Sequence, residues 1–169
     1  MTEASATRPR SRWRLPIEVA IVLAIVGAIR YGQTRGLPTG PLPSVALTSL
    51  DGSPLSLGAR GHGYVVHFFA TWCGVCRAEE GNISSLARDH ELIAIASQSG
   101  GVPPVRDYVI GAGLDPDQVA LDADGSVAQR FGVRAFPTTF YVAPDGRVST
   151  VEVGYTSELG MRLRAWWAE

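Results

Sequence analysis

The chain has 169 residues, of which 46% are hydrophobic, and its formal net charge is −1. This length suits one domain of ordinary size plus a short appendage, and the apolar content is sufficient for a buried core. The charge is uneven: residues 1–35 carry six arginines and two acids, whereas residues 36–169 carry nine arginines and fourteen acids. The acidic body has no basic stripe, so nucleic-acid binding is excluded from the expected functions.

The N-terminus has the pattern of a membrane anchor. Residues 1–14 form an arginine-rich flank, residues 15–29 are mostly apolar, and Arg30 and Arg35 follow. Because positive charge is retained on the cytoplasmic side, we expect the flank inside and the body outside. We therefore predict a signal-anchor over residues 15–31 of a single-pass protein of the cytoplasmic (inner) membrane, with the body in the periplasm or outside. The stretch is short for a span, so a cleaved signal peptide and a buried helix of a soluble domain are alternatives.

A Pro/Gly-rich segment over residues 32–43 predicts an extended linker, after which a domain occupies residues 44–169. The domain is expected to open with a hairpin over residues 45–57 and to continue with a strand at 64–70, buried on both faces. Further on, we predict helices at 77–90, 105–111 and 126–131 and strands at 92–97 and 119–122. A second hairpin, 138–153, turns at Pro144-Asp145-Gly146.

The last predicted helix covers residues 157–168, with Ser157 as its cap, and its apolar face is supplied by Leu159, Leu163, Trp166 and Trp167. Together, the predicted elements indicate an α/β fold with a mixed sheet.

The only two cysteines stand three residues apart, in Thr71-Trp72-Cys73-Gly74-Val75-Cys76-Arg77. At the start of a helix such a pair favours a thiolate, which is the nucleophile of disulfide exchange, and the second thiol can then resolve the mixed disulfide. A zinc site would require four ligands, and a structural disulfide across so short a loop would constrain the unfolded chain little. We therefore expect redox catalysis through a Cys73–Cys76 disulfide, without a metal or an organic cofactor.

A buried strand, a Trp-Cys-x-x-Cys that opens a helix and a later Phe136-Pro137-Thr138 resemble the thioredoxin fold, a mixed central sheet flanked by helices. The anchor, the extra N-terminal β-hairpin and the strings around the cysteines resemble the TlpA-like, membrane-anchored thioredoxins. Two short strings, residues 98–100 and 153–156, resemble the branch called suppressor of copper sensitivity D, a protein disulfide oxidoreductase.

The resemblance implies that Cys73 is the exposed nucleophile and Cys76 the buried resolving thiol. Pro137 would be cis and would face the pair, which leaves the backbone of Phe136 free to bond an extended polypeptide and keeps metals from the sulfurs. Trp72 would shield the thiols and offer an apolar surface to partners. The alternatives are a turn proline and an ordinary core tryptophan.

Two further residues are candidates for a proton relay to Cys76. His67 occupies a position where thioredoxins carry aspartate and TlpA-like proteins often carry asparagine. It could relay a proton or, if protonated, stabilise a thiolate; the alternative is a core histidine. Glu79 matches an acidic position of the cytochrome-maturation members and could exchange a proton with Cys76, or it could be an exposed helix acid.

The Gly74-Val75 dipeptide between the cysteines contains no cation that would stabilise the reduced form. We therefore expect a reduction potential well below the value of about −120 mV of the strongest periplasmic oxidants. The predicted function is a thiol–disulfide oxidoreductase that acts on protein thiols and disulfides, with reduction the favoured direction and a membrane electron donor of the disulfide-reductase type. A copper-handling module that uses the same thiols and a disulfide-forming oxidant are the alternatives. A peroxiredoxin would carry a lone peroxidatic cysteine after Pro and Thr, whereas this chain carries a pair that follows Trp72.

Overall fold

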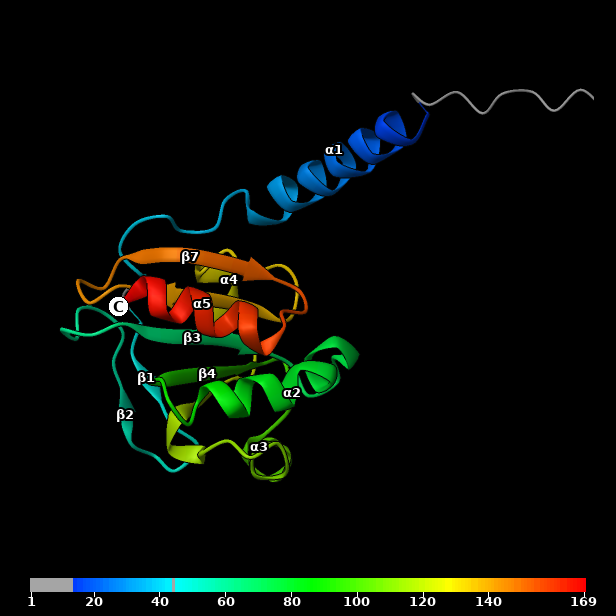
Figure 1. Cartoon of the computed structure of the whole chain (residues 1–169). Coiled ribbons are helices and arrows are strands. Elements are labelled where there is room, and N and C mark those ends of the chain that lie inside the picture. The colour runs from blue at the N-terminus through cyan, green and yellow to red at the C-terminus, as the bar shows by residue number, and fades with distance from the viewer. Residues whose placement is uncertain (1–13, 44) are drawn as a thin grey trace, which may run out of the picture. The chain divides into compact units, whose positions relative to one another are not determined.

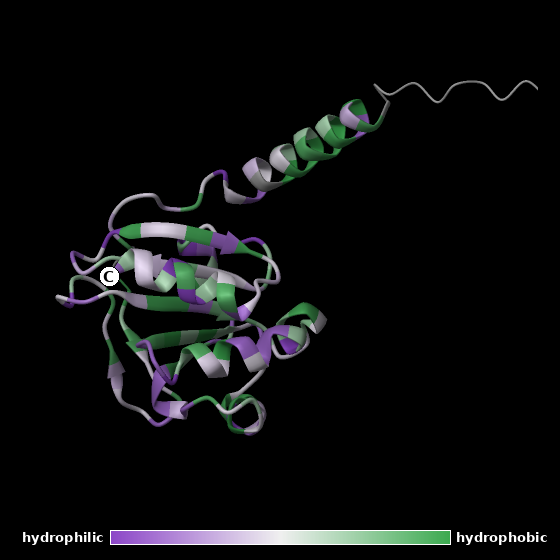
Figure 2. Ribbon diagram, in the orientation of Figure 1, coloured by the Kyte–Doolittle hydropathy of each residue, from purple (hydrophilic) through white to green (hydrophobic). Residues whose placement is uncertain are grey.

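A computed structural model describes residues 14–43 and 45–169, which form two compact units, Met1–Arg35 and Gly36–Glu169 (Figure 1). The first unit is the helix α1, Arg14–Thr34, within which Leu15–Thr34 is long and apolar enough to cross a membrane. The ribbon of α1 is coloured mostly as hydrophobic except near its two ends (Figure 2). The helix extends three residues beyond the predicted span of 15–31. The arginine-rich flank lies outside the described residues, apart from Arg14.

The second unit is built on a five-stranded sheet of order β5-β4-β3-β6-β7. The central strand β3, Tyr64–Phe69, pairs in parallel with β4, Leu92–Ser97, and antiparallel with β6, Thr138–Val142. The edge strands are β5, Val119–Asp122, parallel to β4, and β7, Val148–Val153, antiparallel to β6. The mixed central sheet of the thioredoxin fold is therefore confirmed.

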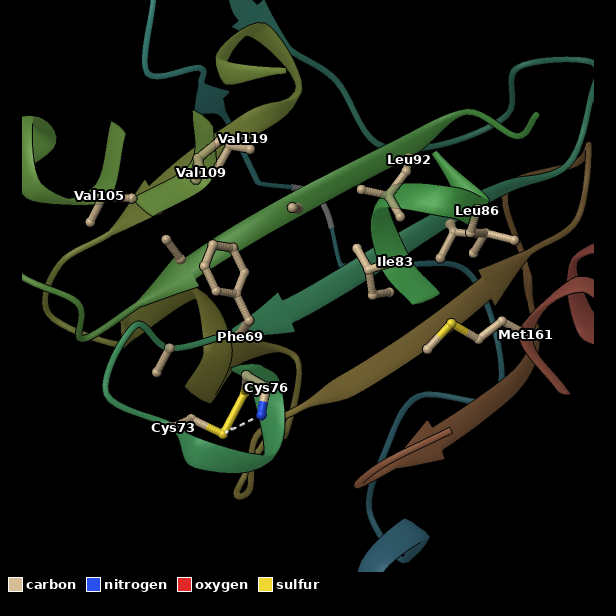
Figure 3. Packing of buried hydrophobic residues seen from close by; sticks show 14 of the residues in the cluster. Phe69, Cys73, Cys76, Ile83, Leu86, Leu92, Val105, Val109, Val119 and Met161 are labelled. Atoms are coloured by element: carbon tan, nitrogen blue, oxygen red, sulfur yellow. Dashed lines mark hydrogen bonds between the residues drawn. A yellow bond between two sulfur atoms is a disulfide. The ribbon is translucent and has the colours of Figure 1, made fainter. Parts of the chain in front are cut away.

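Alternate side chains of β3 enter two different cores. Val65 and Phe69 belong to a cluster on one face of the sheet, which also contains Ile83, Leu86 and Met161 (Figure 3). The side chains of Val66 and Phe68 belong to the other cluster, together with Ala128, Phe131 and Phe140. Because successive side chains of a strand point to opposite faces, a strand covered on both faces reads as the continuous apolar run seen here.

Helices cover both faces of the sheet. The first cluster lies beneath α2, Gly74–Leu86, and α5, Glu158–Ala168, and also receives Val105 and Val109 from α3, Val102–Gly111. The second lies beneath α4, Ser126–Arg130. Helix α2 begins three residues before its predicted start, because Cys73 is its N-cap, and α3 begins earlier because Pro103 and Pro104 suit a first helical turn. A short 3-10 helix, Pro116–Gln118, precedes β5.

The N-terminal hairpin is present but shorter than predicted. Its strands are β1, Leu47–Thr48, and β2, Pro54–Leu55, paired antiparallel. The backbone N–H of Leu50 donates to the carbonyl of Val119 at 2.8 Å, which fastens the hairpin to the edge strand β5. The hairpin is therefore joined to the edge of the sheet, where Ser49 forms an isolated antiparallel bridge with Ala120 of β5.

Residues 36–43 are not the extended linker that the sequence predicts. Leu37 is buried in the second cluster, the N–H of Val148 donates to the carbonyl of Gly40 at 2.9 Å, and the N–H of Leu42 donates to Gly146. The proline and glycine content indicates that this segment is neither helix nor strand, but it does not indicate whether the segment packs on a domain. The compact unit therefore begins at Gly36 rather than at residue 44.

The apolar face predicted for the last helix is exposed rather than buried. Leu159, Leu163, Trp166 and Trp167 are exposed, and the buried residues of α5 are Met161, Ala165 and Ala168. Both sets have helical spacing, so periodicity alone does not choose between them. The C-terminal end of the helix packs closely on the domain: a Cβ added to Gly63 would lie 2.9 Å from the carbonyl oxygen of Ala168, so position 63 has no room for a side chain.

Candidate active site

The two cysteines lie where β3 gives way to α2. Cys73 is the N-cap of α2, and its Sγ accepts a hydrogen bond of 3.1 Å from the backbone N–H of Cys76 (Figure 3). The two side chains form a disulfide, with their Cα atoms 5.3 Å apart. A helix N-terminus carries partial positive charge and free N–H groups. In the reduced protein the same position therefore stabilises a thiolate on Cys73.

The exposure of the two cysteines differs less than the resemblance implies. Cys73 is 7% exposed and Cys76 is 4% exposed in this disulfide form. The carbonyl oxygen of Phe136 approaches within 3.5 Å of the Sγ of Cys73 and contributes to this burial. Nearby, Trp72 is 59% exposed, so the accessible surface beside the disulfide belongs to an aromatic ring.

The loop before β6 brings Phe136 and Pro137 to the disulfide. The Phe136–Pro137 peptide bond is cis, as the resemblance implies, and the carbonyl of Pro137 accepts the N–H of Gly154 at 2.8 Å. The Phe136 ring meets the Trp72 ring edge to face, with centroids 5.9 Å apart. The fold thus unites three residues that were singled out in two separate motifs.

The loop after β4 supports Trp72 in a way that sequence reasoning missed. The indole N–H of Trp72 donates to the carbonyl of Gln98 at 2.9 Å, and the N–H of Thr71 donates to Ser99 Oγ at 3.0 Å. Gln98 has a φ of +50°, in the left-handed region that few residues other than glycine adopt. The only sequence signal was the Gln98-Ser99-Gly100 string.

A pocket of about 560 Å³ opens beside Phe136. Its lining is mostly polar and combines Gln98 with residues of α4 and of the loop that precedes Pro137, including Asp124, Gln129 and Arg134. This lining combines Gln98 with residues between 124 and 136, and its polar side chains form no recognisable motif. Sequence reasoning therefore did not find it.

Glu79 is fully buried on α2, one turn after Cys76. Its Oε1 accepts the backbone N–H of Thr156 at 2.6 Å, and its buried Oε2 has no hydrogen-bond partner among the described residues. Burial raises the pKa of Glu79 to about 7, against the opposing effect of the Thr156 N–H. The exposed helix acid that was its alternative reading is thus excluded.

His67 is buried on β3, and its Nδ1 lies 3.0 Å from Thr139 Oγ1. Burial lowers the pKa of His67 to about 3, so the ring is neutral at physiological pH and supplies no positive charge to a thiolate. His67 and Cys76 nevertheless line the same cavity of about 10 Å³, together with Tyr108 and Glu80. This volume is close to the minimum that holds one water molecule.

Within residues 14–43 and 45–169, no group of three or more His, Cys, Asp or Glu side chains is arranged to hold a metal ion. The chemistry available at the site is that of the two sulfurs, of the imidazole that shares a cavity with Cys76 and of the buried acid one helical turn after Cys76.

Comparison with known proteins agrees with this geometry. The Redoxin family model matches residues 38–162. The chain belongs to the Redoxin family. It is 30% identical over 156 residues to a thioredoxin-like protein of Haemophilus influenzae, covering 90% of this chain and 92% of that protein. It is 28% identical over 149 residues to the thiol-disulfide oxidoreductase ResA of Bacillus thuringiensis subsp. konkukian, covering 80% and 85%.

Among solved structures, a thiol:disulfide interchange protein of Chlorobium tepidum TLS, described as a thioredoxin family protein, superposes with a TM-score of 0.64. The two sequences are 30% identical, and the match covers 78% of this chain and 96% of that one. Together with the Cys73–Cys76 disulfide, these relatives identify the chain as a thiol–disulfide oxidoreductase of the TlpA/ResA/DsbE type. The finer resemblance to suppressor of copper sensitivity D stays a prediction.

Proposed function

We propose that this protein exchanges disulfides with protein substrates outside the cytoplasmic membrane, through Cys73 and Cys76, and that reduction is the favoured direction. The observation that carries the proposal is the position of Cys73 Sγ, which accepts the N–H of Cys76 at the N-terminus of α2 and lies beside the exposed ring of Trp72. This position favours a nucleophilic thiolate next to a surface on which a polypeptide can lie.

In the proposed reaction the Cys73 thiolate attacks one sulfur of the substrate disulfide. A mixed disulfide forms, and the other substrate sulfur leaves as a thiolate that takes up a proton. Cys76 then loses its proton and attacks Cys73 Sγ, which releases the second substrate sulfur and closes the Cys73–Cys76 disulfide. Two electrons pass from the pair to the substrate, and a donor dithiol must reduce the pair again.

Substrate contact is assigned to the surface around Phe136. The carbonyl of Phe136 is directed at Cys73, the Trp72 ring lies edge to face with the Phe136 ring, and Phe136 also lines the pocket of about 560 Å³. An extended polypeptide would cross Pro137 and hydrogen-bond to the backbone of Phe136. Gly74 and Val75, both exposed, would border it on the opposite side.

The proton of Cys76 is assigned to Glu79, with His67 as a second route. Glu79 lies one helical turn from Cys76, and its pKa of about 7 lets it accept and return a proton near neutral pH. His67 shares a cavity with Cys76 and can relay a proton in its neutral form through its Nδ1 contact with Thr139.

The location is proposed from α1. A helix long and apolar enough to cross a membrane precedes the domain, and arginines are concentrated before it in the sequence. We assign the protein to the cytoplasmic membrane as a single-pass protein, with its N-terminus inside and its domain in the periplasm or outside. A membrane electron donor of the disulfide-reductase type would then supply the electrons.

Reduction of insulin in the presence of dithiothreitol tests the chemistry. Cys73→Ser is expected to reduce the rate to the uncatalysed level, whereas Cys76→Ser is expected to accumulate a mixed disulfide, visible by non-reducing electrophoresis. Ala78→Ser, an exposed position of the same helix, is the matched control and is expected to retain full activity. Full activity in Cys73→Ser would remove the proposed nucleophile.

Alkylation in living cells tests direction and location. A membrane-impermeant mass tag added to intact spheroplasts is expected to modify both thiols, and the pair is expected to become oxidised when the membrane donor is deleted. A pair that is oxidised in every background would reverse the proposed direction. Thiols that react only after lysis would contradict the proposed location.

A further inference from the structure

The C-terminal helix α5 exposes an apolar face. Its residues are Leu159, Leu163, Trp166 and Trp167, which are 68%, 56%, 64% and 83% exposed. Their spacing of four, seven and eight residues places them on one face of the helix, opposite the buried Met161, Ala165 and Ala168. We call these four residues the α5 outer face. Scattered apolar side chains on a surface are ordinary, but two tryptophans and two leucines on one short helix face form a contiguous patch.

We propose that the α5 outer face lies in the lipid–water interface of the same membrane that holds α1. This inference rests on the proposed membrane location, and it adds a second point of contact between the protein and the bilayer. Three observations carry it: the residue types of the face, the short connection between α1 and the domain, and the position of the face beside that connection.

The residue types match a membrane interface. Tryptophan has an apolar ring with one polar N–H, and it is enriched where a protein meets the headgroup region. Helices that lie in this plane carry tryptophan and leucine on the face that enters the lipid. In water, the exposed rings of Trp166 and Trp167 would make no comparable favourable contact.

The connection keeps the domain at the membrane surface. Helix α1 ends at Thr34, and Leu37 is already buried in the core of the domain. Three residue steps of extended chain span at most about 11 Å. The point at which the chain joins the domain is therefore held within this distance of the end of the span, whatever orientation the domain adopts.

One end of the α5 outer face, at Trp167, lies near the edge strand along which this connection runs. Trp167 lines a pocket with Ser149 and Thr150 of β7. The chain that leads in from α1 flanks the same strand, since the carbonyl of Gly40 accepts the N–H of Val148 and Pro41 pairs with Arg147. Trp167 and the segment that contains Gly40 and Pro41 thus both lie beside the start of β7.

The arginines of α5 are already paired within the domain. Arg162 contacts Asp89 and Glu158, and Arg164 contacts Glu152. The face therefore offers apolar area rather than unpaired positive charge, and residues 36–169 carry more acids than arginines. We expect the contact to form on neutral phosphatidylcholine and to be insensitive to ionic strength, unlike a contact between a basic patch and anionic lipid.

Quenching by brominated lipid tests the proposal on the full chain. The double variant Trp13→Phe/Trp72→Phe retains Trp166 and Trp167, and it is reconstituted in nanodiscs of phosphatidylcholine with or without bromine on the acyl chains. We expect brominated chains to quench the tryptophan emission. We also expect 0.5 M salt to leave the quenching unchanged, because salt screens charges, over about 10 Å already at 0.1 M, but does not weaken an apolar contact. Emission that is equal in the two lipids would overturn the proposal.

A second variant, Trp72→Phe/Trp166→Phe/Trp167→Phe, retains Trp13 and separates the two levels of inference. If Trp13 is quenched but Trp166 and Trp167 are not, the anchor is in the bilayer and the α5 contact is refuted. If Trp13 is not quenched either, the proposed membrane location itself has failed. Blue-shifted emission from Trp166 and Trp167 without quenching, together with a cross-linked dimer, would assign the face to a second copy instead.

The two leucines supply a graded test. Leu159→Ser/Leu163→Ser is expected to weaken the quenching of Trp166 and Trp167 without lowering the thermal midpoint, because both side chains are already exposed. The matched control is Ile110→Ser on α3, whose side chain is 57% exposed, close to the 56% of Leu163. The control is expected to leave the quenching unchanged, and an equal effect of both variants would contradict the assignment to α5.

Discussion

At the scale of single residues, the site depends on what burial does to two ionisable groups of opposite kind. Burial favours the neutral form of each, which raises the pKa of Glu79 to about 7 and lowers the pKa of His67 to about 3. Glu79 is therefore the group beside Cys76 that changes its charge near neutral pH. A carboxyl group retained at this cost in a core is consistent with a role in proton transfer.

The raised pKa of Glu79 predicts how stability depends on pH. The folded protein holds this proton up to about pH 7, and the unfolded chain loses it near pH 4.5. The stability that this proton contributes is therefore fully present below pH 4.5 and is lost as the pH rises through 7. The free energy of unfolding falls by about 3 kcal/mol over this range. Glu79→Gln is expected to remove this change from urea unfolding of the oxidised protein at pH 5 and pH 8.

The quantity to compare is the difference in unfolding free energy between wild type and variant, because His67 changes the pH dependence of stability in the opposite direction. Its lowered pKa contributes stability that is present above pH 6.5 and is lost as the pH falls toward 3. Glu80→Gln, on the same helix and only partly buried, is the control. A wild type and Glu79→Gln that differ equally at both pH values would contradict the raised pKa.

At the scale of elements, α5 shows that helical spacing alone does not identify the buried side of a helix. Two sets of residues have helical spacing, the buried Met161, Ala165 and Ala168 and the exposed α5 outer face. The buried side packs closely on the domain, since a side chain at position 63 would collide with the backbone of Ala168. The membrane-contact proposal gives the exposed side a role.

Paired truncations on α5 measure this difference. Met161→Ala removes a side chain that is fully buried and is expected to lower the free energy of unfolding by roughly 2–5 kcal/mol. Leu163→Ala removes an exposed side chain and is expected to change it by no more than about 0.5 kcal/mol. Equal losses in urea unfolding would show that α5 buries its outer face in solution.

At the scale of the whole molecule, the segment that leaves α1 belongs to the domain. Leu37 completes the cluster around Phe131 and Val133, and backbone hydrogen bonds join Gly40 and Leu42 to the β6–β7 hairpin. The segment both stabilises the fold and shortens the connection to α1. The two roles follow from the same contacts.

Shortened chains test this boundary. A chain that begins at Gly36 is expected to unfold cooperatively. A chain that begins at Val45 is expected to be less stable by roughly 2–4 kcal/mol, because it loses the burial of Leu37 and two backbone hydrogen bonds. Denaturant midpoints report the difference, and Leu37→Ala in the longer chain should reproduce part of it. Identical midpoints would indicate that residues 36–43 are a free linker, as the composition predicts.

The sequence by itself determined the order and type of the main elements, the redox pair and the Phe136-Pro137 motif. Each of these features has a local sequence pattern: an apolar run for β3, a turn signal for the last hairpin, and two cysteines one helical turn apart. Element boundaries were less well predicted where a cap or a proline pair decided them, as at Cys73 and Pro103.

Only the tertiary structure decided which side of α5 is buried, that residues 36–43 pack on the domain, and what surrounds Glu79 and His67. Glu79 accepts a hydrogen bond from a residue 77 positions away, and His67 contacts one 72 positions away. The physical reason is that burial depends on which surfaces the whole chain brings into contact, and burial is what sets the pKa values and the exposed aromatic face. A local pattern indicates which element a segment can form, and the packing of distant segments determines which of its side chains are exposed to water.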